Sequence, residues 1–483
     1  MTPSEVFLRN GPLIDGHWRT STSLGAMDHL NPATNAPQAE VHIGGRAEID
    51  DAVAAAKRAA PAWAETPGAT RRDILLRWAA LIERDAALFA RLAALESGVP
   101  VMMGGGVSLA LSWIRYYAGW ADKLDGQAVD PIGASGLNYT RLEPYGVVGL
   151  IIPWNSPMVA TAMKAAPALA AGNVVVLKPP TITPFVALRL GELALEAGLP
   201  AGVFNVVPGD AEAGDALVTH PDVAKISFTG GESVARIVMR ACAENLKPLA
   251  LELGGKSASL VFPDADLAAA ATMAAIQGCA VLSGQGCVLP TRVYAHADIY
   301  DAFVEHVRGV AQSFTVGDPT APTTFVGPVI SSSAAERILS VIGRAQSDGA
   351  RLIAGGHRVG GDLAAGNFIA PTVFADVGHD SELARREVFG PVLAICKFSA
   401  DEEAIAKAND SNYGLGAYLH TRDVSRAHRI AKALKAGAVS INSGVPMAPN
   451  TPFGGYKQSG FGREGGRAGV DEFVQLKNVY VPF

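Results

Sequence analysis

Gly146-Val147-Val148-Gly149-Leu150-Ile151-Ile152 is a continuous apolar run of strand length. Such a run predicts a strand that is covered on both faces, as in a parallel sheet. Residues 173–177 have the same character, and residues 157–169 between the two runs have the composition of a helix. Together the three segments predict a β-α-β unit, and this unit decides the fold class.

The alternation continues on both sides of this unit. Residues 204–207 and 223–228 are further strand-like runs, so we predict a doubly wound parallel sheet whose ligand crevice lies beyond the carboxyl ends of the strands. Pro153-Trp154-Asn155, Lys178-Pro179 and Thr229-Gly230-Gly231 each follow such a strand. A second α/β alternation begins after Glu252, with an expected helix over 267–282, and continues through Asn442. It predicts a second α/β domain.

Composition limits the function classes. A chain of 483 residues is long enough for about three domains. The net charge of -6 and the lack of a Lys/Arg run give no reason to expect nucleic acid or a membrane surface as a partner. The 4 cysteines form no C-x-x-C pair and the N-terminus lacks a basic-then-apolar signal, so we expect a reducing, cytoplasmic setting. The 10 histidines are dispersed, and no metal site is expected.

Cys287 is the candidate nucleophile, because a thiolate attacks carbonyl groups and forms a thioester that water can cleave. It lies in a Gly/Gln-rich turn, Ser283-Gly284-Gln285-Gly286-Cys287. A single cysteine is more often a buried packing residue, which is the alternative here. Cys242 and Cys396 lie in helix-like and strand-like runs and are interpreted as core, as is Cys279 within the expected helix over 267–282.

Glu252 and Asn155 are the other two candidate catalytic residues. The Glu252 carboxylate could activate the water that hydrolyses a thioester, a role that a partly apolar setting favours. Its alternative role is to accept backbone hydrogen bonds from the adjoining Gly254-Gly255 turn. Asn155 could donate to an oxyanion, or it could merely cap a helix that begins near Pro157.

Seven motifs follow one another along the chain in an order typical of one enzyme family. They are Pro153-Trp154-Asn155-Ser156-Pro157, Lys178-Pro179-Pro180-Thr181, Phe228-Thr229-Gly230-Gly231, the Glu252 and Cys287 segments, Glu387-Val388-Phe389-Gly390-Pro391-Val392, and Pro452-Phe453-Gly454-Gly455-Tyr456-Lys457-Gln458-Ser459-Gly460. Together they resemble the NAD(P)-dependent aldehyde dehydrogenase superfamily, in its hydrolytic, non-acylating type. The resemblance extends from about Leu13 to the C-terminus.

The resemblance implies an aldehyde dehydrogenase-like α/β fold with three parts. Residues 1–122 and 143–254 would form the dinucleotide-binding domain, and residues 255–454 the catalytic domain. Residues 123–142 and 455–483 would form a protruding β-arm and tail that add to a neighbouring subunit. A homodimer or homotetramer is therefore expected.

The resemblance also implies roles for the site residues. The Asn155 amide and the Cys287 backbone N–H would hold the oxyanion, and Glu252 would activate water. The residues implied in cofactor binding are Ile152, Trp154, Lys178, Thr181, Gly230, Gly231, Glu387 and Phe389. No G-x-G-x-x-G fingerprint follows the first strand of the β-α-β unit, so a strand-to-helix turn at Gly230-Gly231 would meet the pyrophosphate instead.

Two departures from the family pattern bear on the cofactor. Thr181 stands where many relatives have a glutamate that binds the adenosine ribose hydroxyls and repels a 2′-phosphate, so NADP becomes possible. Gly231 stands where many have serine. NAD remains the first expectation.

The resemblance places a further set of residues along an aldehyde tunnel: Leu109, Trp113, Ser156, Met163, Val281, Val288 and Met447. Taken singly, each of these residues fits core packing better than a place in the tunnel. The set is mostly apolar, which predicts a medium-chain or aromatic apolar aldehyde as the substrate. The alternatives are an NADP-preferring semialdehyde dehydrogenase and a coenzyme A-acylating thiol enzyme, and Glu252 argues against the latter because acylating relatives typically lack it.

Overall fold

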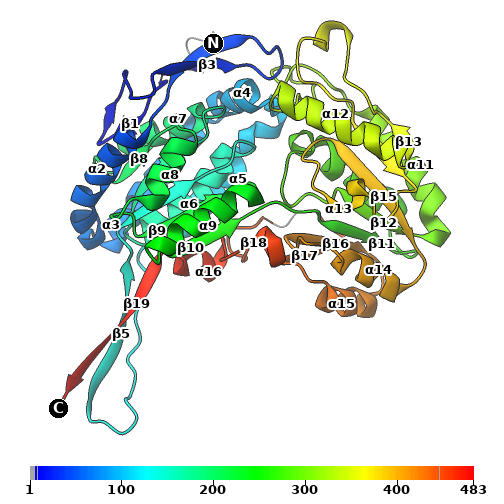
Figure 1. Cartoon of the computed structure of the whole chain (residues 1–483). Helices are drawn as coiled ribbons and strands as arrows, with labels where there is room; N and C mark the ends of the chain where they lie inside the picture. Colours follow the sequence, from blue (N-terminus) through cyan, green and yellow to red (C-terminus); the bar gives the residue numbers. More distant parts are fainter. Residues whose placement is uncertain (1–5, 8, 445–446) are drawn as a thin grey trace.

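The computed structural model describes residues 6, 7, 9–444 and 447–483 of the chain. It contains two α/β bodies side by side, with a thin two-stranded arm that extends from the first of them (Figure 1). The expected α/β class is confirmed, as are the predicted strands and the helix of the first β-α-β unit: β6 (Val147–Ile151), α6 (Pro157–Ala170) and β7 (Val174–Lys178).

The sheet of the first body has the strand order β18-β10-β9-β6-β7-β8-β1-β2. Its five central strands, β10 to β8, are parallel, whereas β18, β1 and β2 join antiparallel at the two edges. Every side chain of β6 and β7 is buried, which explains their continuous apolar sequences. The remaining strands are β8 (Phe204–Val206), β9 (Lys225–Thr229), β10 (Leu249–Glu252), β18 (Gly460–Phe461), β1 (Leu13–Ile14) and β2 (His17–Trp18).

Helices cover both faces of this sheet. One face carries α2 (Arg46–Glu65), which contacts α8 (Ala211–Thr219), and α8 in turn contacts α9 (Glu232–Glu244). The other face carries α6 and α7 (Phe185–Glu196), which pack on α3 (Gly68–Arg84) and α5 (Val107–Ala118), with α4 (Ala86–Ser97) beside α7. Because β6 and β9 are neighbours although β7 and β8 lie between them in the chain, the strand order reverses at this pair. Such a reversal opens a ligand crevice at the carboxyl ends.

The second body is built on a seven-stranded sheet of order β13-β14-β15-β12-β11-β16-β17, parallel except for β13. The strands are β11 (Ala258–Val261), β12 (Arg292–His296), β13 (Arg351–Ala354), β14 (Thr372–Ala375), β15 (Val392–Phe398), β16 (Gly416–His420) and β17 (Ala438–Ile441). Two apolar cores flank it, with α10 (Leu267–Ala275) and α11 (Tyr300–Ser313) in one. The other contains side chains of α12 (Ser332–Ser347), α14 (Asp401–Asn409) and α15 (Val424–Ala433).

The helix expected over 267–282 is wrong at its C-terminal end. The α-helix stops at Ala275, continues as a π-helical turn over Ile276–Ala280, and ends in a 3-10 turn over Val281–Gly284. By length and hydropathy alone, Leu267–Gly284 could cross a membrane, but half of it is buried in the protein and core helices pass the same test. The break redirects the chain towards Cys287.

The arm consists of β5 (Gly136–Pro144) and β19 (Val474–Pro482), which pair antiparallel from Val474 opposite Pro144 to Pro482 opposite Gly136. A two-stranded arm built from the two predicted regions is thus present, although β5 continues past residue 142 to Pro144. Residues 455–483 divide between two places, because β18 pairs with β10 in the first sheet and α16 (Gly466–Asp471) contacts α6. A separate hairpin, β3 (Ala26–Leu30) with β4 (Pro37–His42), lies near the N-terminus.

Candidate active site

A cavity of about 580 Å³ lies at the carboxyl ends of the central strands of the first sheet, and residues of the second body complete its wall. All three predicted catalytic residues line it, namely Cys287, Glu252 and Asn155. So do seven of the eight predicted cofactor residues: Ile152, Trp154, Lys178, Gly230, Gly231, Glu387 and Phe389. The structure therefore brings together residues that are far apart in the sequence.

Cys287 is held by a loop with unusual backbone geometry. Leu282 and Ser283 have positive φ values of 50° and 52°, and Gly284 follows with 71°. Non-glycine residues rarely adopt this conformation, and when they do it is often at a functional site. The Ser283 hydroxyl donates to Gly327 O at 2.9 Å, which helps to hold the turn.

Glycines allow three segments to approach one another closely around Cys287. A Cβ on Gly255 would lie 2.4 Å from the Cys287 carbonyl oxygen, and one on Gly284 would lie 2.1 Å from Gly390 O. A Cβ on Gly254 would meet the Glu387 carboxylate at 2.4 Å. Side chains at these positions would separate the cysteine, the Glu252 strand and the Glu387 loop.

Asn155 serves the cysteine loop and does not cap α6. Its Nδ2 donates to Gln285 O at 2.7 Å, whereas the N-cap of α6 is Ser156. The capping alternative is therefore wrong. An amide nitrogen carries two hydrogens, and the bond to Gln285 uses one, so the other remains available for an oxygen atom in the cavity.

Glu252 ends β10 and is almost completely buried. The alternative role at the Gly254-Gly255 turn belongs to another residue, because Gly255 N donates to Glu387 Oε1 at 3.0 Å. Glu252 Oε1 has no hydrogen-bond partner among the described residues. Burial and the neighbouring Glu464 carboxylate raise the Glu252 pKa well above its usual value, and Lys164 and Arg463 partly oppose this shift.

Burial likewise raises the pKa of Cys287, with further contributions from the Glu252 and Glu387 carboxylates. The thiol is therefore mostly protonated at neutral pH in the protein alone. Burial raises the pKa of Glu387 to about 7, although the Gly255 N–H and Lys256 act in the opposite direction. The cavity accordingly contains three acidic groups whose neutral forms are favoured by the low-dielectric surroundings.

Sequence reasoning missed a buried ion pair behind Glu252. Lys164 Nζ lies 2.6 Å from Glu464 Oε1 and donates to Ser227 Oγ at 2.8 Å. Glu464 and Lys164 also line a small cavity that reaches Glu252. The available signal was Lys164 itself, since it is a lone charge within an otherwise apolar helix and such a charge needs a partner.

The crevice has features that suit a dinucleotide. Helix α9 begins directly after Gly230-Gly231 without a side-chain cap, so its first N–H groups can meet a pyrophosphate. A Cβ on Gly230 would lie 2.5 Å from the Phe228 ring, while nothing lies within 4 Å of the Cβ position on Gly231. Val218, Val234, Ile237 and Ala241 provide an apolar wall for a planar base. Lys178 Nζ donates to Gly209 O at 2.6 Å, and burial lowers its pKa to about 8.

Two aromatic rings lie near the reactive end of the crevice. Phe389 has a positive φ of 52°, and its ring lies edge-on to Trp154 with centroids 5.3 Å apart.

Thr181 is the one predicted cofactor residue that does not line the cavity. It is buried beside the cavity, and its hydroxyl donates a hydrogen bond to Asp210.

None of the seven predicted substrate residues lines this cavity. Trp113, Met163 and Val288 are buried in the apolar core, and Leu109 and Met447 pack against it. Ser156 occupies the N-cap position of α6 without a side-chain capping bond, and Val281 begins the 3-10 turn before Cys287. The predicted contacts of these side chains with an aldehyde stay predictions. The adjoining residues 445 and 446, part of the substrate loop expected over 443–451, lie outside the described residues.

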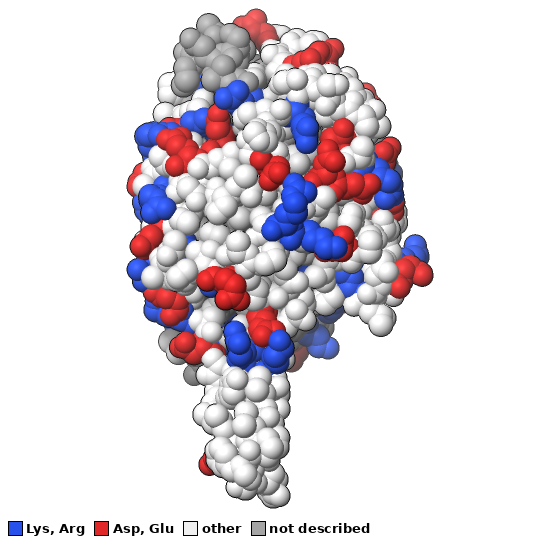
Figure 2. Space-filling view, turned by 90° about the vertical axis from the view of Figure 1, so that its left-hand side faces the viewer, with Lys and Arg blue, Asp and Glu red and all other residues white. Residues whose placement is uncertain are grey.

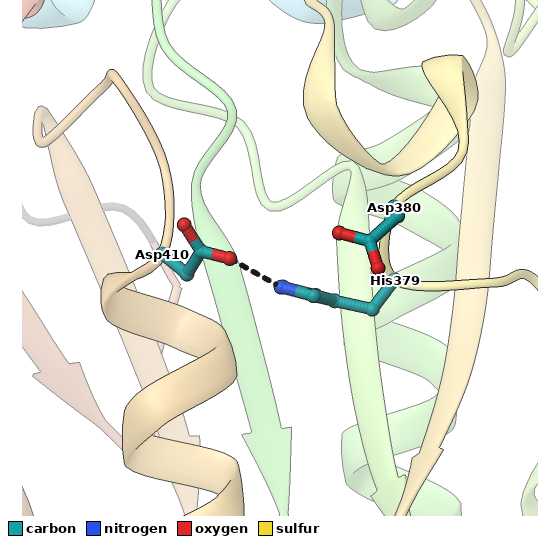
Figure 3. Close-up of side chains that lie close together, drawn as sticks. All are labelled: His379, Asp380 and Asp410. Carbon is teal, nitrogen blue, oxygen red and sulfur yellow. Dashed lines mark hydrogen bonds and ion pairs between the residues drawn. The ribbon is translucent and has the colours of Figure 1, made fainter.

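A second polar cluster lies in the other body, where His379, Asp380 and Asp410 come close enough to share a cation (Figure 3). His379 Nε2 is 2.9 Å from Asp410 Oδ2, and its Nδ1 is 2.8 Å from the Tyr294 hydroxyl. Arg385 forms ion pairs with both aspartates. Because Arg385 already pairs with both carboxylates, the cluster is explained as an ion-pair network.

The parallel sheet with its reversal point, the glycine turn at a helix N-terminus and the buried lysine at the end of β7 together define a dinucleotide-binding α/β protein. Comparison with known proteins specifies the class further. Residues 18–479 match the family model described as "Aldehyde dehydrogenase family", and the chain belongs to that family. It is an NAD(P)-dependent aldehyde dehydrogenase.

Relatives and solved structures agree over nearly the whole chain. An aldehyde dehydrogenase of Aspergillus niger is 41% identical over 97% of this chain and 94% of its own. The NAD+ complex of a Bacillus cereus aldehyde dehydrogenase is 40% identical, with a TM-score of 0.96 over 99% of this chain and 98% of its own. A structure named as an E. coli NADP dependent enzyme is 38% identical, with a TM-score of 0.96 over 99% of both chains.

Proposed function

We propose that this enzyme oxidises an apolar medium-chain or aromatic aldehyde to the free carboxylic acid through a thioester on Cys287. The observation that carries the proposal is the placement of Cys287, Glu252 and Asn155 in the wall of one cavity that also holds the dinucleotide crevice. The three side chains supply a nucleophile, a base and an oxyanion donor.

In the first step the Cys287 thiol loses its proton to water, its sulfur bonds as thiolate to the aldehyde carbon, and the carbonyl π electrons move to oxygen. The Asn155 Nδ2 hydrogen that Gln285 does not use is available to this oxyanion, together with the Cys287 backbone N–H. Collapse of the oxyanion expels a hydride and leaves a thioester on Cys287. The nicotinamide ring, when bound, accepts that hydride.

In the second step water attacks the thioester carbon while Glu252 takes its proton, and the Cys287 sulfur leaves as thiolate. The products are the carboxylic acid and the free enzyme. A buried carboxylate with a raised pKa is well suited to this proton transfer, because it is a stronger base than an ordinary carboxylate. The Lys164–Glu464 pair behind it supplies charged groups to which that proton could pass.

Glu252 also separates this proposal from transfer of the acyl group to coenzyme A. With a base in the cavity, water can compete for the thioester, and no external thiol is needed to release the acid. We propose hydrolysis for this reason.

The test is an aldehyde panel that includes an aliphatic medium-chain aldehyde, an aromatic aldehyde and one with a distal carboxylate, each with NAD and with NADP. Absorbance of the reduced nicotinamide gives the rate, and product analysis with and without coenzyme A distinguishes acid from acyl-CoA. The proposal expects the highest kcat/KM for an apolar aldehyde and acid as the product. A preference for the distal carboxylate would overturn the substrate class, and acyl-CoA formation would overturn hydrolysis.

We further propose that the arm joins subunits. Leu137, Leu476 and Val481 are exposed apolar side chains on its strands, and on the face in Figure 2 the arm carries few charges compared with the rest of the surface. Light scattering after gel filtration should give a mass of two or four chains. Deletion of 476–483 should lower that mass, and a monomeric parent enzyme would contradict the proposal.

A further inference from the structure

The crevice runs across the strand ends from β10, where Glu252 lies, to the loop after β8. Four strand spacings separate β10 from β8, which is about 19 Å. Cys287 and Glu252 mark the reactive end, and Gly230-Gly231 lie between the two ends. The second nucleoside of a dinucleotide therefore belongs near α8 and the loop after β8, where Lys178 and Asp210 line the wall.

The Asp210 side chain does not make the hydrogen bond expected from its position at the start of a helix. It is the N-cap residue of α8, yet its side chain accepts no capping hydrogen bond from that helix. Its Oδ1 instead accepts a hydrogen bond from the buried Thr181 hydroxyl at 3.0 Å. The carboxylate is thereby tied to the segment that follows β7, beside Lys178.

The backbone supports this arrangement. Lys178 Nζ donates to Gly209 O at 2.6 Å, and Gly209 N donates to Pro179 O at 3.3 Å. The loops after β7 and β8 are thus joined by three hydrogen bonds, one of which is the Thr181–Asp210 bond. Asp210 is therefore a positioned side chain at the edge of the crevice, although it is exposed to solvent.

The charges at this end favour a ribose with free hydroxyls over one with a phosphate. Lys178 is the one Lys or Arg among the described residues that line the cavity, whereas Asp210 and Asp215 both line it nearby. Asp215 is neutralised by Arg46 at 3.0 Å, but Asp210 makes no ion pair among the described residues. Its carboxylate can accept hydrogen bonds from ribose hydroxyls, while NADP sites typically use an arginine for the 2′-phosphate.

We propose that Asp210, held by Thr181, selects NAD over NADP by placing a carboxylate where the 2′-phosphate of NADP would lie. This inference rests on the NAD(P) dependence of the enzyme and deepens that assignment. Position 181 has no glutamate, but Asp210 supplies a carboxylate at the same end of the crevice. The Thr181 hydroxyl is also occupied as a donor and cannot serve a phosphate. Repulsion by the Asp210 carboxylate and the lack of a free Thr181 donor both weaken binding of the 2′-phosphate.

The experiment measures binding of two nucleotides by isothermal titration calorimetry, without aldehyde and without turnover. Adenosine 2′,5′-bisphosphate carries the 2′-phosphate, and 5′-AMP lacks it. For the parent enzyme, we expect 5′-AMP to bind at least about tenfold more tightly, since a dianion next to a carboxylate is repelled at low ionic strength. Asp210→Asn should reduce this ratio about tenfold, mainly by strengthening binding of the bisphosphate.

Two further variants sharpen the result. Thr181→Val keeps the carboxylate but removes the hydrogen bond that positions it, so the ratio should fall by a smaller factor than in Asp210→Asn. Asp222→Asn is the matched control, because it removes a charge from an exposed aspartate paired with Lys57 outside the crevice, and its ratio should equal that of the parent. Added salt should narrow the parent's ratio and leave that of Asp210→Asn nearly unchanged.

A parent enzyme that binds the bisphosphate as tightly as 5′-AMP would overturn the proposal, as would an unchanged ratio in Asp210→Asn. Far-UV circular dichroism and thermal melting verify that each variant is folded. NAD-dependent aldehyde oxidation is measured separately with the same proteins. If oxidation is intact and the nucleotide ratio is unchanged, only the role of Asp210 fails, whereas a failed oxidation assay bears on the proposed function.

Discussion

The reactive end of the crevice and the His379 cluster are both groups of polar side chains beside a parallel sheet, but their bonding differs. In the His379 cluster, both ring nitrogens have partners and Arg385 pairs with the two aspartates. At the reactive end, Glu252 Oε1 lacks a partner among the described residues, and Cys287 faces the same cavity. Buried polar groups are normally satisfied, so one left without a partner in a cavity indicates a functional group.

The largest effect is expected for Cys287→Ala. The variant lacks the atom that bonds to the substrate, so NAD(P)H production should fall at least about 10³-fold. Cys279→Ala is the matched control, because that thiol is buried in the second body and donates to Thr372 O. Absorbance of the reduced nicotinamide gives both rates. Activity above a tenth of the parent's in Cys287→Ala would remove the cysteine from the mechanism.

Glu252→Gln should slow hydrolysis of the thioester by about 10²–10⁴-fold, the range for loss of a general base. Hydride transfer precedes this step, so a burst of reduced nicotinamide should remain in stopped-flow measurements. A substitution in the His379 cluster should not produce this difference between the burst and the steady-state rate. A normal steady-state rate in Glu252→Gln would contradict the assignment.

The raised pKa of Glu252 also predicts a dependence of stability on pH. Because its pKa is higher in the folded than in the unfolded chain, the folded state favours the neutral carboxyl. The stabilisation is present below about pH 4 and is lost as pH rises through the folded pKa. The free energy of unfolding of Glu252→Gln should therefore exceed that of the parent by an amount that grows with pH. Denaturation curves at several pH values measure this difference, and a difference that shrinks as pH rises would contradict the sign.

Asn155→Ala should lower kcat about 10²–10³-fold through loss of an oxyanion donor. It also removes the hydrogen bond to Gln285 O, so the position of the cysteine loop is part of the effect. Nucleotide binding measured by calorimetry should change little, which separates this role from cofactor binding. A variant that loses nucleotide affinity and retains kcat would indicate that Asn155 serves the cofactor.

The smallest effect is expected for His379→Gln. The side chain lies in the second body, and its hydrogen-bond partners among the described residues are Tyr294 and Asp410. The value of kcat/KM should therefore stay within about twofold of that of the parent. Partly exposed ion pairs contribute little to stability, and the melting temperature should fall by no more than a few degrees. A large loss of activity would show that the cluster acts on the site and would break the contrast drawn between the two regions.

Local sequence predicted much of the site because the site motifs lie at the ends of strands that the sequence predicts. Lys178 ends a strand whose apolar sequence was clear, and Asn155 and Gly230 each follow such a strand. Parallel strands place their carboxyl ends at one edge of the sheet. The substrate residues were less predictable. Trp113 and Met163 have the apolar character of a tunnel wall, but the same character suits the core in which they lie. The helix over 267–282 was wrong at its end because a π-helical turn has no distinct composition.

By itself, the sequence determined the two α/β bodies, the strand-end positions of the motifs and the candidate for the nucleophile. These follow from periodicity and residue chemistry, which act over a few neighbouring residues. Only the tertiary structure decided that Glu387 accepts from the Gly255 turn, that Lys164 pairs with Glu464 behind Glu252, and that Thr181 binds Asp210. These contacts join segments from different strands and loops, and their energies depend on burial and distance, which exist only once the chain is folded.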